Sequence, residues 1–147
     1  MRRMRRLLVG AGVMAAIAVG GSAPAAADHN VRVLATVMTG AEEVPGPGDS
    51  DGIGVAGLVV GVDRGRICYA LAVRKIAPAN AAHIHRGVAG EAGPIEVALN
   101  APTRGFSAAC RPVDPALAAE IANTPDQFYV NVHNADFPAG AVRGQLG

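Results

Sequence analysis

Short apolar segments rich in β-branched residues recur along the chain, and each is bounded by Gly, Pro or Asp. In the segment 67–74 the odd-numbered residues from Ile67 to Val73 are apolar and share one face, which is the period of a half-buried strand. Residues 63–66 form a predicted hairpin turn, in which Gly65 can adopt a left-handed conformation. We predict about eight short strands, at 31–38, 53–62, 67–74, 82–86, 95–100, 106–110, 128–133 and 141–146.

One short helix is predicted near 115–123. Asp114 can cap its N-terminus, Pro115 fits the first helical position, and Leu117 and Ile121 form a single apolar stripe. Such a helix is suited to covering one end of a sheet. Many short strands with one helix predict an all-β fold, either an antiparallel β-sandwich or a Greek-key barrel. The pattern does not decide between these two.

The charge balance depends on the first residues of the chain. The 147 residues include 13 Lys and Arg against 12 Asp and Glu, but four of the arginines lie within the first six residues. The rest of the chain then carries nine basic and 12 acidic residues, a net charge of −3. An acidic body of one-domain size has no basic surface to neutralise many phosphates, so we expect no nucleic-acid partner.

Residues 1–27 have the three-part pattern of a secretory signal peptide. An arginine-rich start is followed by an apolar stretch of 15 residues at 7–21 and by small residues up to Ala27. The apolar stretch is short for a bilayer core, which needs ~20 residues. We therefore predict cleavage after Ala27 and a secreted single domain at 28–147 with no transmembrane segment. A retained N-terminal anchor is the alternative, and the Arg5-Arg6 pair leaves twin-arginine export open.

Two cysteines, Cys68 and Cys110, would reach an oxidising compartment as an even pair. A disulfide between them would stabilise the fold by roughly 3 to 4 kcal/mol through the chain entropy of the closed loop. A metal site would favour closely spaced ligands, and a catalytic cysteine would require an activating base. We therefore predict a structural disulfide.

Three histidines lie in two segments that are predicted to be strands. Because side chains alternate across a strand, His83 and His85 project to one side, and Asn131 and His133 do the same on the later strand. If the two strands are neighbours, these side chains converge. An H-x-H pair with a third imidazole meets the minimum for a Cu²⁺ or Zn²⁺ site, provided that the ring nitrogens lie within ~6 Å of one another.

The alternative role for these histidines is structural. They would then hydrogen-bond the facing loops at 87–93 and 134–140 and hold the backbones of those loops at the end of the sheet. His29 follows the predicted cleavage site and could bind copper only adventitiously, together with the free amine.

Other polar motifs carry weaker signals. Glu42 and Glu43 are adjacent and precede Pro45 in a turn-rich loop, so we expect solvated carboxylates and not an acid/base pair. Asp49 and Asp51 are similar to part of a calcium-binding loop, but the spaced glutamate of that motif is missing, which favours a flexible connection. No nucleophile elbow, P-loop or dinucleotide fingerprint is present.

Four segments in register resemble the signature blocks of the CHRD (chordin) domain family. They are residues 39–45 (TGAEEVP), 82–94 (AHIHRGVAGEAGP), 129–133 (YVNVH) and 138–146 (PAGAVRGQL). The resemblance implies an all-β extracellular domain and implies little about activity. It places His83, His85, Asn131, His133, Arg143, Gln145 and Glu43 at motif positions. The last block departs from the commoner GEIRGQ pattern by lacking the glutamate that could pair with Arg143.

A looser similarity is to Cu/Zn superoxide dismutase, another Greek-key sandwich with an H-x-H strand. In that case His83, His85 and His133 would hold copper, and Arg143 would attract an anion. The chain has only one further histidine, no recognisable bridging imidazole and a different cysteine pairing. We therefore do not expect dismutase activity.

The sequence as a whole predicts a secreted, non-enzymatic binding or structural module. Its partner would be an extracellular or cell-envelope component, and its functional face would include His83, His85, Asn131 and His133. The alternative is a protein that binds copper or zinc through the three histidines.

Overall fold

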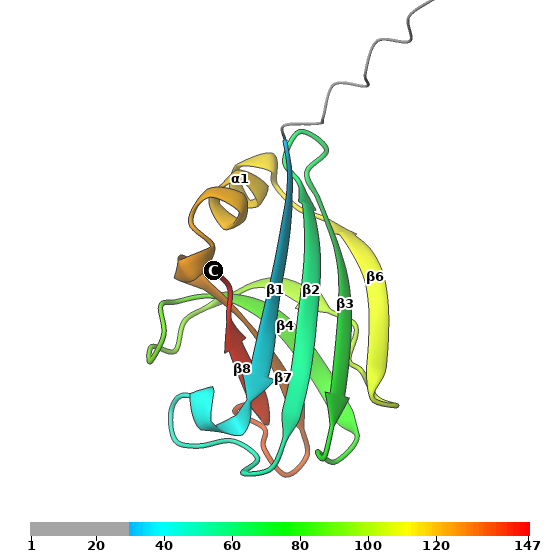
Figure 1. The fold of residues 1–147 in the computed structure, drawn as a ribbon, viewed down its shortest axis with the longest axis vertical. Helices are drawn as coiled ribbons and strands as arrows, with labels where there is room; N and C mark the ends of the chain where they lie inside the picture. Colours follow the sequence, from blue (N-terminus) through cyan, green and yellow to red (C-terminus); the bar gives the residue numbers. More distant parts are fainter. Residues whose placement is uncertain (1–29) are drawn as a thin grey trace, which may run out of the picture.

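The computed structural model describes residues 30–147 (Figure 1). The predicted signal peptide and His29 lie outside these described residues. All eight predicted strands are present, and most of their ends agree within two residues, although one begins at Ala79, earlier than expected. The strands are β1 (Val31–Thr39), β2 (Ile53–Gly61), β3 (Arg66–Arg74), β4 (Ala79–Arg86), β5 (Ile95–Leu99), β6 (Phe106–Pro112), β7 (Phe128–Asn134) and β8 (Val142–Gln145).

The strands form one antiparallel sheet in the order β5-β4-β7-β8-β1-β2-β3-β6. The sheet curls into a nearly closed barrel, in which β1, β2 and β3 lie on one side and β4 and β7 cross behind them (Figure 1). The β2–β3 hairpin turns at Gly65, whose φ of 50° is the left-handed conformation that we predicted. The all-β prediction is therefore confirmed.

The core is aliphatic and lies inside the barrel. On β3 the odd-numbered residues from Ile67 to Val73 are buried, and the residues between them face outward, as the alternation predicts. Val60, Ile84, Val130 and Val132 are fully buried from other strands. Since the inward positions are occupied by apolar side chains, polar side chains on the same strands must lie on the outer face.

One α-helix, α1 (Pro115–Asn123), covers an end of the barrel (Figure 1). Asp114 accepts a hydrogen bond from the backbone N–H of Ala116 at 2.7 Å, so the predicted cap is confirmed. The buried helical residues are Ala118 and Ile121, whereas Leu117 is only half-buried against the core. Both residues of the predicted stripe therefore face the core, and Ala118 adds to it. Two short 3-10 helices, η1 (Gly40–Glu42) and η2 (Pro125–Gln127), flank the strands.

A disulfide joins Cys68 of β3 to Cys110 of β6, as predicted. The two cysteines are direct partners in the antiparallel register, so the bond closes across neighbouring strands. Because β6 is an edge strand that pairs only with β3, the disulfide fastens this edge of the sheet to its neighbour.

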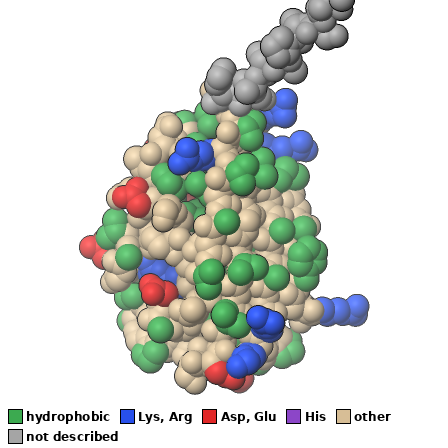
Figure 2. Space-filling view, in the orientation of Figure 1, with side chains coloured by type: hydrophobic (Ala, Val, Ile, Leu, Met, Phe, Trp, Pro, Cys, Tyr) green, Lys and Arg blue, Asp and Glu red, His purple; other side chains and the backbone are tan. Residues whose placement is uncertain are grey.

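The outer face of β1, β2 and β3 carries mainly small and apolar side chains (Figure 2). Basic side chains are scattered around its margins, and none of the described histidines is visible on this face. The loop before β2 packs against the barrel, since the N–H of Gly48 donates to the carbonyl of Gly40 at 2.7 Å and that of Asp49 donates to the carbonyl of Ala141 at 2.9 Å. No helix within residues 30–147 has the length and apolar character to cross a membrane.

Candidate metal centre

The two histidine-bearing strands, β4 and β7, are antiparallel neighbours. In their register His83 lies opposite Asn131, and His133 lies opposite Ala81. Ile84 between the two β4 histidines points into the core, as predicted. The three imidazoles therefore meet on the outer face of the sheet.

The imidazoles approach one another closely enough to share one ion. Among residues 30–147, His83, His85 and His133 are the group in which three potential ligand atoms converge, and these atoms all lie within 4.8 Å of one another. Nδ1 of His83 is 3.1 Å from Nε2 of His133. Nitrogens bound to one tetrahedral Zn²⁺ at about 2.0 to 2.1 Å are about 3.4 Å apart, so a contraction of roughly 1 Å would complete the site. The separations of the ring nitrogens are therefore within the ~6 Å that shared ligation requires.

Backbone carbonyls fix the orientation of two of the rings. Nδ1 of His85 lies 2.9 Å from the carbonyl oxygen of Gly93, and Nδ1 of His133 lies 3.0 Å from that of Pro138. A carbonyl can only accept a hydrogen bond, so each neutral ring carries its proton on Nδ1 and a lone pair on Nε2. Hydrogen bonds from the ring nitrogen that does not bind the metal are typical of metal-bound histidines. The loop-holding role that is the alternative thus involves one nitrogen of each ring. The other nitrogen, Nε2, has no partner in His85, whereas in His133 it faces His83 and Asn131.

The available nitrogen of His85 is buried and has no hydrogen-bond partner. An unpartnered buried polar atom costs free energy because it has lost its hydrogen bonds to water. A cation at this position would offset that cost. His85 itself is 8% exposed, whereas His83 and His133 are partly exposed, so the cluster is open to solvent at one side.

The cluster favours the uncharged, ligating form of imidazole. Burial, followed by the charges of His133 and His85, lowers the pKa of His83 to about 4, although a hydrogen bond that the ring donates to Asn131 opposes the shift. Burial also lowers the pKa of His133, although its hydrogen bond to Pro138 opposes the shift. At neutral pH these two rings are therefore neutral, which is the state that binds a metal.

Asn131 belongs to the same face. Its side-chain oxygen Oδ1 lies 3.0 Å from Nε2 of His133, and only 2% of its surface is exposed. The predicted convergence of Asn131 with the three histidines is therefore what the structure shows. A polar amide at this position can orient the ring or supply an additional oxygen donor.

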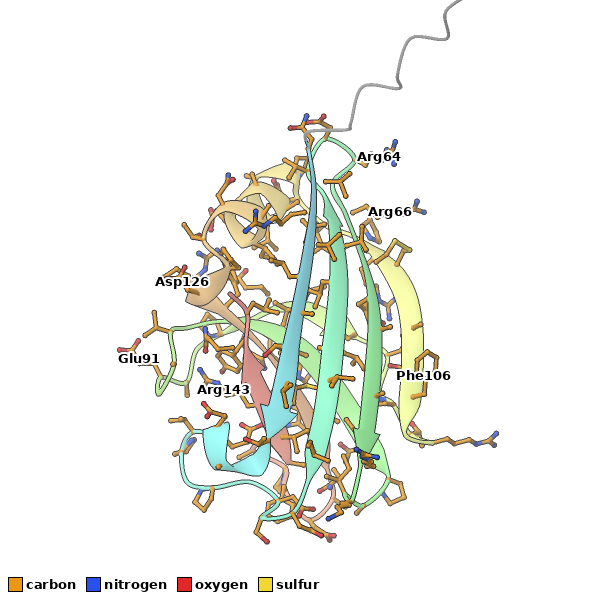
Figure 3. All side chains as sticks on the ribbon, viewed as in Figure 1. Arg64, Arg66, Glu91, Phe106, Asp126 and Arg143 are labelled. Atoms are coloured by element: carbon orange, nitrogen blue, oxygen red, sulfur yellow. A yellow bond between two sulfur atoms is a disulfide. The ribbon has the colours of Figure 1, made fainter. Side chains whose placement is uncertain are left out.

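An aromatic side chain of β7 and a basic side chain of β8 pack beside the histidines. The ring of Tyr129 stacks on His85, and the guanidinium carbon of Arg143 lies 3.5 Å from the centre of the same tyrosine ring. Arg143 is 1% exposed and donates to the backbone carbonyls of Glu91 and Val88 at 2.8 and 2.9 Å. Figure 3 shows Arg143 and Glu91 on the same side of the barrel. Arg143 thus holds a loop in place and is not accessible to attract an anion from solvent.

Gln145 also ties loops to the sheet. Its side-chain nitrogen lies 2.8 Å from the carbonyl oxygens of Gly87, Asp126 and Phe128, and its side-chain oxygen accepts from Arg143 at 3.2 Å. The two C-terminal motif residues therefore anchor the loop that carries Gly93. Through Gly93 they act on the orientation of His85.

The expectation that Glu43 is a solvated carboxylate is wrong. Glu42 is exposed, but Glu43 is 6% exposed and lies against Gly140. Burial raises the pKa of Glu43 to about 7, although the charge of Arg143 and a backbone hydrogen bond from Val44 oppose the shift. Adjacent residues of this loop have opposite environments, which local composition could not reveal.

Alternation along β7 also predicts that Tyr129 lies on the side of Asn131 and His133, and its contact with His85 agrees with this. The loops 87–93 and 134–140 are the expected partners of the histidines, and the structure identifies the acceptors as the carbonyls of Gly93 and Pro138. Side-chain identity does not reveal which backbone carbonyls accept these hydrogen bonds. That depends on the course of each loop in the folded protein.

One of the comparisons with known proteins identifies a family. No curated protein and no solved structure matches the chain. The sequence pattern of the CHRD domain matches residues 34–146, which is most of the chain and includes every strand that contributes to the site. This chain belongs to the CHRD domain family.

Proposed function

We propose that the protein is a secreted, non-enzymatic binding module and that its binding face takes up one divalent copper or zinc ion. The observation that carries this proposal is the convergence of His83, His85 and His133 with ligand atoms within 4.8 Å. The hydrogen bonds of His85 and His133 to backbone carbonyls add to it, because they direct Nε2 of each ring away from the loop.

The donor set favours these two metals. Imidazole nitrogens suit Zn²⁺ and Cu²⁺, whereas Ca²⁺ and Mg²⁺ favour carboxylate and carbonyl oxygens. The three ligands are uncharged, so the bound ion keeps its positive charge. Copper would bind more tightly than zinc at such a site by the usual order of affinities.

Several features support a role outside the cytoplasm. The N-terminal 27 residues have the pattern of a signal peptide, and the Cys68–Cys110 disulfide is typical of proteins in oxidising compartments. Membership of the CHRD family agrees with an extracellular location. The partner would then be an extracellular or cell-envelope component that contacts the metal face.

The test is metal analysis of the mature protein, secreted and purified without an affinity tag, after loading with Zn²⁺ or Cu²⁺ and gel filtration. We expect about one ion per chain, which His83→Ala and His133→Ala remove. His29→Ala is the matched control, since it removes an imidazole beside the free amine and should leave the stoichiometry unchanged. Substoichiometric metal that persists in both cluster variants would overturn the metal proposal and leave the histidines as holders of the two loops.

A further inference from the structure

A second polar site lies beside Glu43, and none of the three histidines lines it. A cavity of about 130 Å³ is enclosed by two loops, 43–47 and 136–140. A cavity of about 150 Å³ is large enough for benzene, so this one accommodates a group of four or five heavy atoms. It has the size of a single side chain and not of a larger ligand.

Glu43 is an unusual residue for the wall of such a small cavity. It is 94% buried, and its Oε1 atom has no hydrogen-bond partner. A Cβ at Gly140 would come within 2.3 Å of the carboxylate, so the absence of a side chain at Gly140 makes room for it. The fold therefore keeps a carboxyl group at this cavity in spite of the free energy that its burial costs.

The charged side chains around the cavity have an excess of negative charge that one cation can neutralise. The donors of Arg143 are directed to the carbonyls of Val88 and Glu91, so its guanidinium balances Glu43 from a distance without an ion pair. Asp136 adds a second, exposed carboxylate to the lining. When Glu43 is ionised, as it is above its raised pKa of about 7, Glu43 and Asp136 together carry two negative charges against the single positive charge of Arg143. One bound cation makes this group neutral.

The remaining walls are apolar. Pro45 and Pro47 line the cavity from one loop, and Phe137 and Pro138 line it from the other. Proline and aromatic walls favour an alkyl chain, and an aromatic ring additionally favours a cation. A compact ammonium group needs only one carboxylate oxygen, whereas a planar guanidinium favours paired acceptors.

We propose that the cavity beside Glu43 binds an alkylammonium group, with the ammonium at the Glu43 carboxylate and the alkyl chain between the proline and Phe137 walls. A lysine side chain of a partner polypeptide and a free aliphatic amine share this chemistry. The site adds a second binding function to the domain. It shares the 136–140 loop with the metal site, because the carbonyl of Pro138 is the hydrogen-bond partner of His133, but it uses none of the three histidines.

The experiment follows backbone amide NMR shifts of the metal-free protein at pH 8 during titration with n-butylammonium chloride. We expect saturable shifts at residues 43–47 and 136–140. Sodium butyrate and 1-butanol, which have the same chain with the opposite charge or none, should produce no comparable shifts. Equal shifts with either of them, or no saturable shift with the amine, would overturn the proposal. Equal or tighter binding of n-butylguanidinium would overturn the assignment to an ammonium group.

Two variants connect the binding to its residues. Glu43→Gln keeps the shape of the side chain and should weaken n-butylammonium binding roughly 10- to 100-fold, the effect of losing a charge-assisted hydrogen bond. Glu42→Gln is the matched control, because the same charge is removed from the exposed neighbour, and it should bind like the wild type. Asp136→Asn at the exposed rim does not disturb buried packing and should weaken binding several-fold. Binding that is unchanged in both Glu43→Gln and Asp136→Asn would contradict the proposal.

The source of the ammonium group is distinguished by a second probe. Nα-acetyl-lysine N-methylamide presents the same butylammonium chain on a peptide backbone. Binding at least as tight as that of n-butylammonium would identify a lysine side chain, and binding of the free amine alone would identify a small amine. Both results support the alkylammonium site.

Discussion

The ring of Tyr129 lies parallel to the imidazole of His85, with centroids 4.7 Å apart and an angle of 6° between the planes. The tyrosine hydroxyl accepts a hydrogen bond from the N–H of Gly93 at 3.2 Å, and the carbonyl of Gly93 accepts from Nδ1 of His85. These three residues form a closed cycle of contacts. The aromatic ring and the loop backbone together determine the direction of the lone pair on His85.

Removing the tyrosine hydroxyl tests this cycle. Tyr129→Phe keeps the stacked ring but loses the acceptor for Gly93, so we expect the free energy of unfolding to fall by about 1 kcal/mol. We expect Zn²⁺ affinity, measured by calorimetry, to fall by up to about tenfold. This is the smaller end of the loss seen when a residue that supports a metal ligand is replaced. Tyr69→Phe is the control, because it removes a similar hydrogen bond from the N–H of Asn100 to a tyrosine on β3, outside the β4–β7 pair that carries the histidines. If both variants bind Zn²⁺ equally, the hydroxyl has no role at the site.

The lowered pKa of His83 makes the metal-free protein sensitive to acid. The pKa is about 4 in the folded state against 6.5 ordinarily, so between these values the unfolded chain binds more protons than the folded chain. The free energy of unfolding should therefore fall as the pH drops from 6.5 to 4, by about 1 to 2 kcal/mol after allowance for partial exposure. Urea denaturation in the presence of a chelator measures this change. His83→Gln should remove most of it, and an unchanged pH dependence would show that the histidine is not protected from protons.

Glu43 has the opposite effect on stability. Its pKa rises from 4.5 to about 7 on folding, so the folded chain binds more protons between these values and loses stability as the pH increases through 7. We expect the wild type to lose on the order of 2 kcal/mol between pH 5 and pH 8 from this group. Glu43→Gln should show a flatter profile, and Glu42→Gln should follow the wild type. Parallel profiles for all three proteins would mean that the buried carboxyl does not titrate in this range.

The disulfide should contribute strongly to stability because it closes a separation of 42 residues and fastens edge strand β6. Replacing Cys68 and Cys110 together by Ala should lower the free energy of unfolding by roughly 3 to 4 kcal/mol, and a thiol reductant should have a similar effect on the wild type. The measurement is urea denaturation with and without reductant. The reductant should not affect the double variant, and an equal effect on both proteins would indicate a target other than the disulfide.

Much of the candidate site follows from local patterns. Strict alternation along β4 and β7 placed His83, His85, Asn131 and His133 on the outer face, and the structure confirms this. The sequence pattern does not predict that β4 and β7 are neighbours, and the histidines converge only if they are. They are joined by a segment that contains β5, β6 and α1, so their adjacency depends on the topology of the whole sheet.

The sequence by itself determined the strands, the helix cap, the disulfide and the faces of the histidines. The strands and the faces of the histidines follow from the two-residue alternation of apolar side chains. The helix cap follows from the residue before the helix, and the disulfide follows from there being only two cysteines. Only the tertiary structure decided the curvature that nearly closes the barrel, the carbonyl partners of His85 and His133, and the burial of Glu43 beside exposed Glu42. Those features arise where distant loops meet, and the desolvation and hydrogen bonding of a side chain are set by what packs against it in space.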